Sequence, residues 1–192
     1  MIKALIFDFY GVIYGNFNWD IIDSRIYSDE NKARAFVDLK TSANRGDISN
    51  EELLEQVAKL AEDEKHPNNP AVKFGPSINY AALGLVESLK HKFKIGLLSN
   101  GTHEHISRVF KELQGTDKFF DIVITSSDTQ FIKPSKEAFI SAARKLGVEP
   151  DEVLIIDDSA GHIEGAKKAG LKTIKFDDMD QLRREFEHLE IY

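Results

Sequence analysis

The chain has 192 residues, of which 42% are hydrophobic and 30% are charged, and its formal net charge is −7 at pH 7. This composition is typical of a globular protein with one main core and room for a small second lobe. We expect no nucleic-acid partner and no membrane partner, because both attract basic surfaces rather than acidic ones.

The sequence contains no cysteine, which excludes disulfides and thiolate catalysis and leaves oxygen and imidazole groups as metal ligands. The first residues, MIKALIFDF, lack an apolar segment followed by a small-residue cleavage site. No apolar run is long enough to span a bilayer. We therefore expect a cytoplasmic protein, and the sequence leaves monomer and homodimer both open.

Short apolar runs recur along the chain and predict buried parallel strands. The last run is shorter and more polar than the others, as an edge strand would be. The predicted strands cover residues 3–9, 94–100, 121–127, 152–158 and 172–176.

Helical periodicity separates most of these runs, and a last helical pattern follows the fifth. Strands that alternate with helices indicate repeated βαβ units. We therefore predict an α/β fold with an open, parallel, Rossmann-like sheet. The predicted helices cover residues 80–90, 103–113, 135–146, 161–169 and 178–189.

The segment after the first strand interrupts this alternation, because it has helical patterns but no buried strand run. Its last helical pattern opens with Ser49 and Glu52, which form the S-x-x-E signature of a capping box. The segment ends in HPNNPAVKFGPS (66–77), whose three prolines indicate a linker. The helical patterns lie near 19–28, 30–41 and 50–63.

These features predict two domains. Residues 16–79 would form a small α-helical cap inserted after the first strand. Residues 1–15 and 80–192 would together form the sheet domain.

Polar residues stand where the predicted strands end. In an open α/β sheet, ligands bind outside the carboxyl ends of the strands, so these side chains are expected at one edge. Three carboxylates there would repel one another unless a cation lies among them, and Mg²⁺ prefers oxygen ligands and phosphate. An aspartate in such a setting can act as a nucleophile. The residues at the strand ends are Asp8, Ser99, Asn100, Asp157 and Asp158, and Lys133 lies just before Pro134, between the third predicted strand and its helix.

Four segments in this order, FDFYGVI, LLSNG, KP (133–134) and IIDDSAGHIEGAKKAG, resemble the motifs of the haloacid dehalogenase (HAD)-like hydrolase superfamily. The resemblance covers the whole predicted sheet domain. The helical insert resembles the cap of the subfamily that includes members like phosphoglycolate phosphatase and the epoxide hydrolase N-terminal domain. The piece RGDISNEELLEQ (45–56) is similar to a cap segment of the sugar-phosphate phosphatases in that group.

The resemblance implies a phosphatase that acts on a small phosphorylated metabolite. Asp8 would be the nucleophile, which becomes phosphorylated, and Lys133 would balance the charge. Ser99, with Asn100 and Gly101, would bind the transferring group.

The resemblance also implies a Mg²⁺ cofactor. Asp8, Asp158 and the backbone carbonyl of Tyr10 would bind the ion directly, and Asp157 would act through water or as a further ligand. Arg45 in the cap would clamp an anionic substrate. An exposed turn arginine is the alternative interpretation of Arg45.

Tyr10 departs from the family's phosphatase pattern, which usually has a second aspartate at this position as acid and base. A phenol has a pKa of about 10 and is a poor general base at neutral pH. The pattern D-x-Y-G and the motif LSNG also resemble 2-haloacid dehalogenases, whose halide leaving group needs no proton. A third interpretation is a non-catalytic binding protein.

The fourth motif favours the phosphatase interpretation. Dehalogenases of this fold need no Mg²⁺ and have serine and asparagine where this chain has Asp157, Asp158 and Ser159. Adjacent carboxylates facing Asp8 without a cation would be electrostatically unfavourable. The histidines His103, His105 and His162 are candidates for the missing acid and base, with partly exposed helix-start residues as the alternative interpretation.

Overall fold

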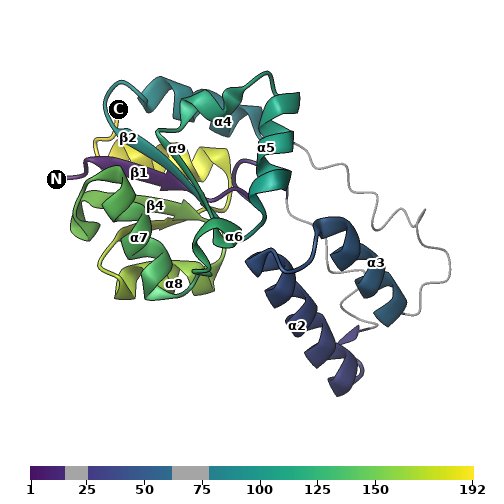
Figure 1. The fold of residues 1–192 in the computed structure, drawn as a ribbon. Helices are drawn as coiled ribbons and strands as arrows, with labels where there is room; N and C mark the ends of the chain where they lie inside the picture. Colours follow the sequence, from purple (N-terminus) through teal and green to yellow (C-terminus); the bar gives the residue numbers. More distant parts are fainter. Residues whose placement is uncertain (16–25, 62–77) are drawn as a thin grey trace.

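The computed structural model describes residues 1–15, 26–61 and 78–192. In these ranges, five parallel strands form one sheet in the order β3-β2-β1-β4-β5 (Figure 1). This arrangement confirms the predicted open parallel sheet. The strands are β1 (Ala4–Phe7), β2 (Lys94–Ser99), β3 (Ile122–Thr125), β4 (Val153–Asp157) and β5 (Lys172–Lys175).

Strand β1 lies at the centre of the sheet, because Ala4 pairs with Lys94 of β2 on one side and with Val153 of β4 on the other. All four β1 residues are buried, which explains why this strand is a continuous apolar run rather than an alternating one. Strand β5 is at the edge, and its lysines Lys172 and Lys175 are exposed, as predicted from its polar sequence.

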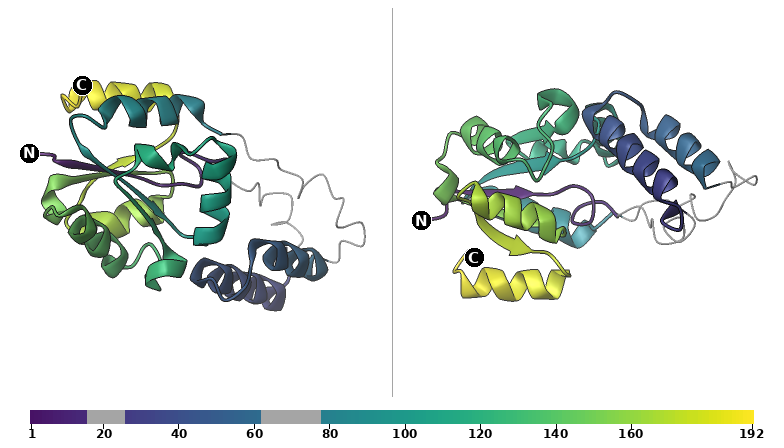
Figure 2. Two further views of the ribbon diagram at one scale, coloured as in Figure 1. Left: turned by 45° about the horizontal axis from the view of Figure 1, so that its top comes forward. Right: turned by 90° about the horizontal axis from the view of Figure 1, so that it is seen from below.

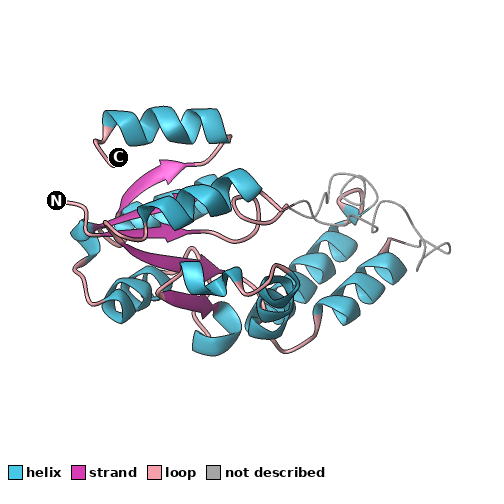
Figure 3. Ribbon diagram, turned by 90° about the horizontal axis from the view of Figure 1, so that it is seen from above, coloured by secondary structure: helices cyan, strands magenta, loops and turns pink. Residues whose placement is uncertain are grey.

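Helices cover both faces of the sheet (Figures 1 and 3). Successive residues of β1 point to opposite faces, so Leu5 and Phe7 belong to one core cluster and Ala4 and Ile6 to another. The first cluster includes apolar residues of α4 (Tyr80–Leu89), α5 (His103–Glu112) and α9 (Met179–His188). The second includes those of α7 (Lys136–Leu146) and α8 (Ala160–Lys168).

The helices that follow β1 form a cap region with its own small core. Helix α2 (Glu30–Arg45) and helix α3 (Asn50–Leu60) lie side by side at one end of the sheet domain (Figure 2). Apolar residues of the two helices, among them Phe36, Ala43 and Val57, pack together. The predicted helix near 19–28 and the predicted linker lie largely or wholly outside the described residues.

The ends of the cap helices follow from local sequence. Helix α2 continues beyond the predicted residue 41 to Arg45, where Gly46 ends it in the left-handed conformation at φ +81°. The predicted capping box is confirmed: Ser49 Oγ accepts from the Glu52 N–H, and the Glu52 carboxylate accepts from the Ser49 N–H.

All five predicted strands are longer than the observed ones, and the third also covers the start of a short helix. Residues 126 and 127 were expected in the third strand, but β3 ends at Thr125 and a short helix, α6 (Ser126–Thr129), follows. Thr125 Oγ1 accepts from the Asp128 N–H and so caps this helix. Two further short helices were not predicted, η1 (Thr116–Phe119) and η2 (Pro150–Glu152). No helix among the described residues is long and apolar enough to cross a membrane.

Candidate active site

Three of the polar residues expected at the carboxyl edge follow or end neighbouring strands of the sheet. Asp8 follows β1, Ser99 ends β2 and Asp157 ends β4. The Asp8 N–H donates to the Ile156 carbonyl over 2.9 Å, which extends the β1–β4 pairing to the carboxylate-bearing residue. The Phe9 N–H donates to Asp8 Oδ1 over 2.6 Å. The carboxylate of Asp8 is therefore held in place, and its residue is only 4% exposed.

Lys133 bridges the two buried aspartates. Its Nζ lies 2.8 Å from Asp8 Oδ1 and 2.6 Å from Asp157 Oδ2, and its side chain is fully buried. Asn100 holds the backbone of Lys133 from both sides: the Lys133 N–H donates to Asn100 Oδ1 over 2.8 Å, and Asn100 Nδ2 donates to the Lys133 carbonyl over 2.9 Å. In this structure Asn100 therefore positions Lys133.

The segment that carries Lys133 also lies very close to α8. A Cβ atom added at Gly165 would be 2.4 Å from the Pro134 carbonyl oxygen and 2.7 Å from Pro134 Cβ. Real Cβ atoms do not approach other atoms so closely, so the helix and the lysine segment can meet only because residue 165 is glycine.

Asp157 has a third partner in His162. His162 Nδ1 lies 2.9 Å from Asp157 Oδ1, and the Ser159 N–H donates to the same oxygen over 2.9 Å. Burial alone would raise the pKa of Asp157, but the charge of Lys133 and the contact with His162 outweigh it and hold that pKa below its usual range. Asp157 is therefore a carboxylate at neutral pH.

Asp8 is affected differently. Burial raises its pKa to about 8, because the opposing charge of Lys133 is partly offset by the negative charges of Asp157 and Asp158. Burial would lower the pKa of Lys133, but Asp8 and Asp157 outweigh it and raise that pKa, so the lysine stays charged. A bound cation would therefore favour the ionised form of Asp8 and offset the negative charges of Asp157 and Asp158 that oppose it.

The oxygen-rich donor set fits a hard divalent cation. Among the described residues, Asp8, Asp157 and His162 form a group whose ligand atoms all lie within 4.8 Å of one another. Asp158, expected as a direct ligand, is not in this group, although its charge acts on Asp8. His162 was expected only as an acid or base, and its position four residues after Asp158 was the signal that placed it near this centre.

Ser99 is the last residue of β2, and the chain turns through Asn100 and Gly101 directly after it; residues 99–101 form the Ser99–Gly101 turn. Ser99 is 1% exposed, and its Oγ has no hydrogen-bond partner among the described residues. Buried hydroxyls are nearly always paired in the absence of a ligand, so this hydroxyl is suited to an incoming oxygen. The Gly101 N–H already donates to Ser126 Oγ over 3.0 Å. Ser126 was not predicted as a site residue, and only the T-x-x-D cap formed by Thr125 and Asp128 could have signalled the short helix that carries it.

The side chain of Tyr10 packs within an aromatic group. Its ring centroid lies 5.0 Å from that of Phe9 and 6.1 Å from that of His105, with the second pair stacked at 19°. A Cβ atom at Gly101 would be 3.0 Å from Tyr10 Cε2, so the ring also lies against the Ser99–Gly101 turn. The Tyr10 ring therefore packs between neighbouring rings and the Ser99–Gly101 turn.

The other two candidate histidines lie in different surroundings. The side chain of His103 is 57% exposed, and its Nδ1 lies 3.1 Å from Asp128 Oδ2. His105 stacks on Tyr10 and contacts Arg108 through its Nδ1 at 3.1 Å.

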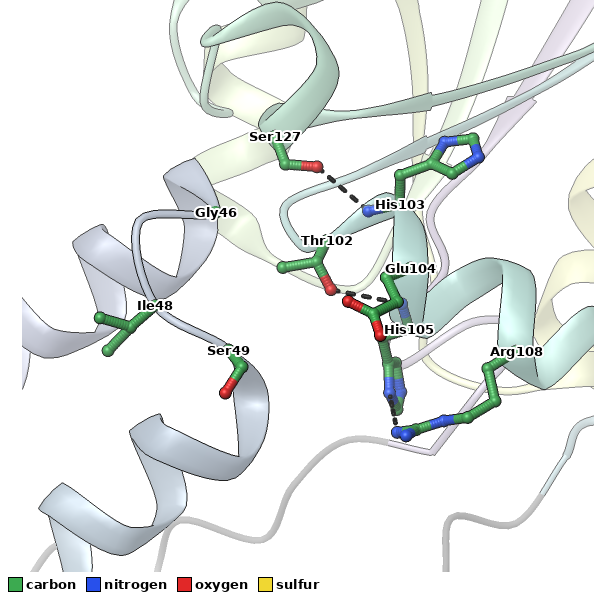
Figure 4. Close-up of a pocket in the computed structure, with 9 residues that line it drawn as sticks. All are labelled: Gly46, Ile48, Ser49, Thr102, His103, Glu104, His105, Arg108 and Ser127. Atoms are coloured by element: carbon green, nitrogen blue, oxygen red, sulfur yellow. Dashed lines mark hydrogen bonds between the residues drawn. The ribbon is translucent and has the colours of Figure 1, made fainter.

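A pocket of about 250 Å³ separates the turn of the cap from the start of α5 (Figure 4). Arg45, expected to clamp the substrate, is exposed and is not among the lining residues. The lining consists of Gly46, Ile48, Ser49, Thr102, His103, Glu104, His105, Arg108 and Ser127.

A parallel sheet with a buried aspartate–lysine–aspartate centre at its carboxyl edge and helices inserted after β1 defines a capped, Rossmann-like α/β protein with a candidate catalytic centre. The sequence profile of haloacid dehalogenase-like hydrolases matches residues 2–170, so the chain belongs to this hydrolase family.

Two curated relatives are bacterial proteins. YhcW of Bacillus subtilis (strain 168), provisionally named a phosphatase, is 28% identical over an alignment that covers all of this chain and 95% of YhcW. Pyrophosphatase PpaX of Bacillus cereus (strain AH820) is 33% identical over 87 residues, which are 45% of this chain and 40% of PpaX.

Two solved structures share the fold. The HAD family enzyme BT-2542 of Bacteroides thetaiotaomicron, in complex with magnesium and inorganic phosphate, matches with a TM-score of 0.70 and 21% identity over 95% of this chain and 99% of that chain. L-2-haloacid dehalogenase from Xanthobacter autotrophicus matches with a TM-score of 0.63 and 21% identity over 99% of this chain and 83% of that chain.

Proposed function

We propose that this hydrolase is a Mg²⁺-dependent phosphatase that cleaves a phosphate monoester of a small metabolite, with Asp8 as the nucleophile. The proposal rests on the buried centre in which Lys133 contacts both Asp8 and Asp157. Burial and the charges of Asp157 and Asp158 oppose the ionisation of Asp8, and Lys133 alone does not offset them, so the nucleophile would need an added divalent cation such as the Mg²⁺ that accompanies a phosphoryl substrate.

Asp8, Asp157 and Asp158 would hold the ion, together with the Tyr10 carbonyl. When bound, Mg²⁺ would neutralise charge on the transferring phosphoryl group and on the carboxylates around it. It would also favour the ionised form of Asp8, which the buried metal-free site disfavours.

The chemistry takes two steps. A carboxylate oxygen of Asp8 attacks phosphorus, the bond from phosphorus to the ester oxygen breaks, and the leaving oxygen takes up a proton. Water then attacks the phosphorus of the phospho-aspartate, which releases inorganic phosphate and restores Asp8. Lys133 and the Ser99 hydroxyl would contact the phosphoryl oxygens as charge shifts onto them.

The pocket between the cap and α5 is not lined by Asp8, Ser99, Lys133 or Asp157. We propose that it receives the part of the leaving group that lies away from the reacting phosphorus. The pocket's volume of about 250 Å³ lies below the range typical of drug-sized ligand sites and suits a small metabolite. Hydroxyl, imidazole and guanidinium groups of its lining residues could hydrogen-bond the oxygens of such a leaving group. We propose that residues 16–79 act as the cap domain over this pocket, with residues 1–15 and 80–192 as the catalytic domain.

The named activities of relatives support the phosphoryl class. YhcW carries a provisional phosphatase name and PpaX is a pyrophosphatase, and BT-2542 binds magnesium and phosphate on the same fold. The second candidate is a metal-independent 2-haloacid dehalogenase. Tyr10 favours it, because a halide leaves without a proton and an acid at that position would serve no purpose.

Two assays separate the candidates. Release of inorganic phosphate from a panel of small phosphate esters, with Mg²⁺ and with EDTA, should show metal-dependent turnover that the Asp8→Asn variant lacks. Mass spectrometry of an acid-quenched reaction should show one added phosphoryl group on a peptide containing Asp8. Metal-independent halide release from 2-chloropropionate, without phosphatase turnover, would reverse the assignment.

A further inference from the structure

The short helix α6 connects the cap to the Ser99–Gly101 turn through one side chain. Ser126 Oγ accepts from the Gly101 N–H over 3.0 Å and donates to the Asn44 carbonyl near the end of cap helix α2. Ser126 is 1% exposed. A hydroxyl has one proton to donate. Here the Ser126 hydroxyl donates that proton to the cap, and its oxygen accepts a hydrogen bond from the turn.

Neighbouring contacts reinforce both ends of this connection. The Ser127 N–H donates to the Gly101 carbonyl over 3.4 Å, so both backbone groups of Gly101 face α6. On the cap side, Gln130 Nε2 donates to the Arg45 carbonyl over 3.3 Å. These bonds satisfy carbonyl groups at the carboxyl end of α2, which the helix itself leaves without partners.

The approach of the cap to α6 is as close as glycine allows. A Cβ atom at Gly46 would lie 2.9 Å from Ser127 Cβ, and the φ angle of +81° at Gly46 also favours glycine. Gly46 and Ser127 both line the pocket shown in Figure 4. The contact between the cap and α6 therefore lies beside the pocket that we propose for the leaving group.

We propose that Ser126 is a positioning residue that couples the seating of the cap on α6 to the geometry of the Ser99–Gly101 turn; this rests on the proposed phosphatase function of that turn. The Gly101 carbonyl, 3.5 Å from Ser126 Oγ, is an alternative acceptor. When the cap lifts, the hydroxyl proton loses the Asn44 carbonyl and turns towards Gly101, which shifts the turn that carries Ser99.

The first test compares Ser126→Ala with Ser126→Thr, which keeps the hydroxyl, and with Ser88→Ala. Ser88 is the control, because its Oγ donates to the Leu85 carbonyl over 2.7 Å within α4, so its loss removes a hydrogen bond outside the proposed site. Inorganic phosphate is the probe, measured as a competitive inhibitor and by calorimetry with Mg²⁺. Loss of the two bonds should weaken phosphate binding about tenfold in Ser126→Ala, with Ser126→Thr restoring affinity and Ser88→Ala unchanged. Equal phosphate affinity in all four proteins would overturn the proposal.

The second test asks whether the cap acts through Ser126. Gly46→Ala should push the cap off α6 and weaken phosphate binding in the wild-type background, but should add nothing in the Ser126→Ala background. Additive effects would overturn the proposed coupling. If Gly46→Ala does not fold, Gln130→Ala takes its place in the same double-mutant comparison, because it removes the side-chain bond to the Arg45 carbonyl and keeps the backbone N–H that donates to the Ser126 carbonyl.

Hydrogen exchange of the ligand-free protein separates this proposal from the proposed function. In Ser126→Ala, the Gly101 amide and the amides of 44–47 should exchange faster together, while Gly46→Ala should speed exchange at Gly101 only when Ser126 is present. If this exchange pattern is seen but the wild-type protein binds no phosphate, the proposed phosphatase function is contradicted and the proposed coupling through Ser126 still holds. Unchanged exchange at Gly101 in Ser126→Ala would contradict the coupling alone.

Discussion

Lys133 Nζ lies 2.8 Å from Asp8 Oδ1, in a place from which water is excluded. The same nitrogen lies 2.6 Å from Asp157 Oδ2. A buried ammonium shared by two buried carboxylates is a costly arrangement unless each charge has its partners. The energetics of the site therefore depend on this lysine, on the charge of Asp8 and on any cation that joins them.

Replacing Lys133 with methionine should abolish turnover and lower stability. Breaking a buried ion pair typically costs about 3–5 kcal/mol, because it leaves an uncompensated charge. Uptake of a proton by Asp8 would reduce that cost, so the loss of Tm should be larger at pH 9 than at pH 6. Calorimetry at both pH values checks this, and a pH-independent loss would contradict it.

Asp8→Asn should abolish turnover and stabilise the metal-free protein. The folded-state pKa of Asp8 is raised to about 8 from its ordinary value of 3.8. The folded form therefore holds a proton that the unfolded form has lost, and stability falls as the pH rises between these two values. In EDTA, the Tm advantage of Asp8→Asn should grow from pH 5 to pH 8 and then level off. Saturating Mg²⁺ should shrink it, and an advantage constant with pH would contradict the assignment.

Much of this site could be predicted from sequence because its residues stand where buried strands end. Parallel strands bring Asp8, Ser99 and Asp157 to one edge whatever the details of packing. Lys133 was harder to place, since a lysine before a helix is by itself unremarkable chemically. Its position depends on Asn100 and on the close approach of Gly165, which link segments far apart in sequence.

The cap contacts could not be predicted in the same way. The helical patterns and the Ser49–Glu52 capping box depend on residues close in sequence, so they could be predicted. The contact between α2 and Ser126 depends on the short helix α6, whose sequence resembles the end of a strand. The reason is that the β-branched Thr125 is both the last residue of β3 and the N-cap of α6. Tertiary contacts of this kind leave no periodic signal.

Tyr10→Asp should raise phosphatase turnover by restoring an acid and base at this position. A positioned acid or base contributes about 10²–10⁴-fold, and the loss of ring contacts with Phe9 and His105 will offset part of the gain. Tyr10→Asn is the matched control, because it removes the same ring without adding an acid. The gain over that control should be largest for esters with poor alkoxide leaving groups. No gain over Tyr10→Asn, in a folded variant that binds Mg²⁺, would mean that the proton is supplied elsewhere.

Mg²⁺ should raise the Tm of the wild-type protein in a concentration-dependent way, since a ligand that binds only the folded state stabilises it by RT ln(1 + [L]/Kd). Asp158→Asn should reduce this shift if Asp158 is a ligand. Asp180→Asn serves as the control, because that side chain is 82% exposed on α9 and lies outside the centre. A full shift in Asp158→Asn would limit the metal site to Asp8, Asp157 and His162.

Gly165→Ala should impair catalysis although residue 165 carries no catalytic group. Its new Cβ atom would lie 2.4 Å from the Pro134 carbonyl oxygen, so α8 or the segment bearing Lys133 must move, and a shift of about 1 Å can cost 10²-fold in rate. Gly84→Ala is the control, because no atom lies within 4 Å of its added Cβ and the residue sits inside α4. That substitution should stabilise the protein by about 0.5–1 kcal/mol and leave turnover unchanged. Comparable turnover in the two variants would show that the lysine segment tolerates displacement and would contradict the tight positioning of Lys133.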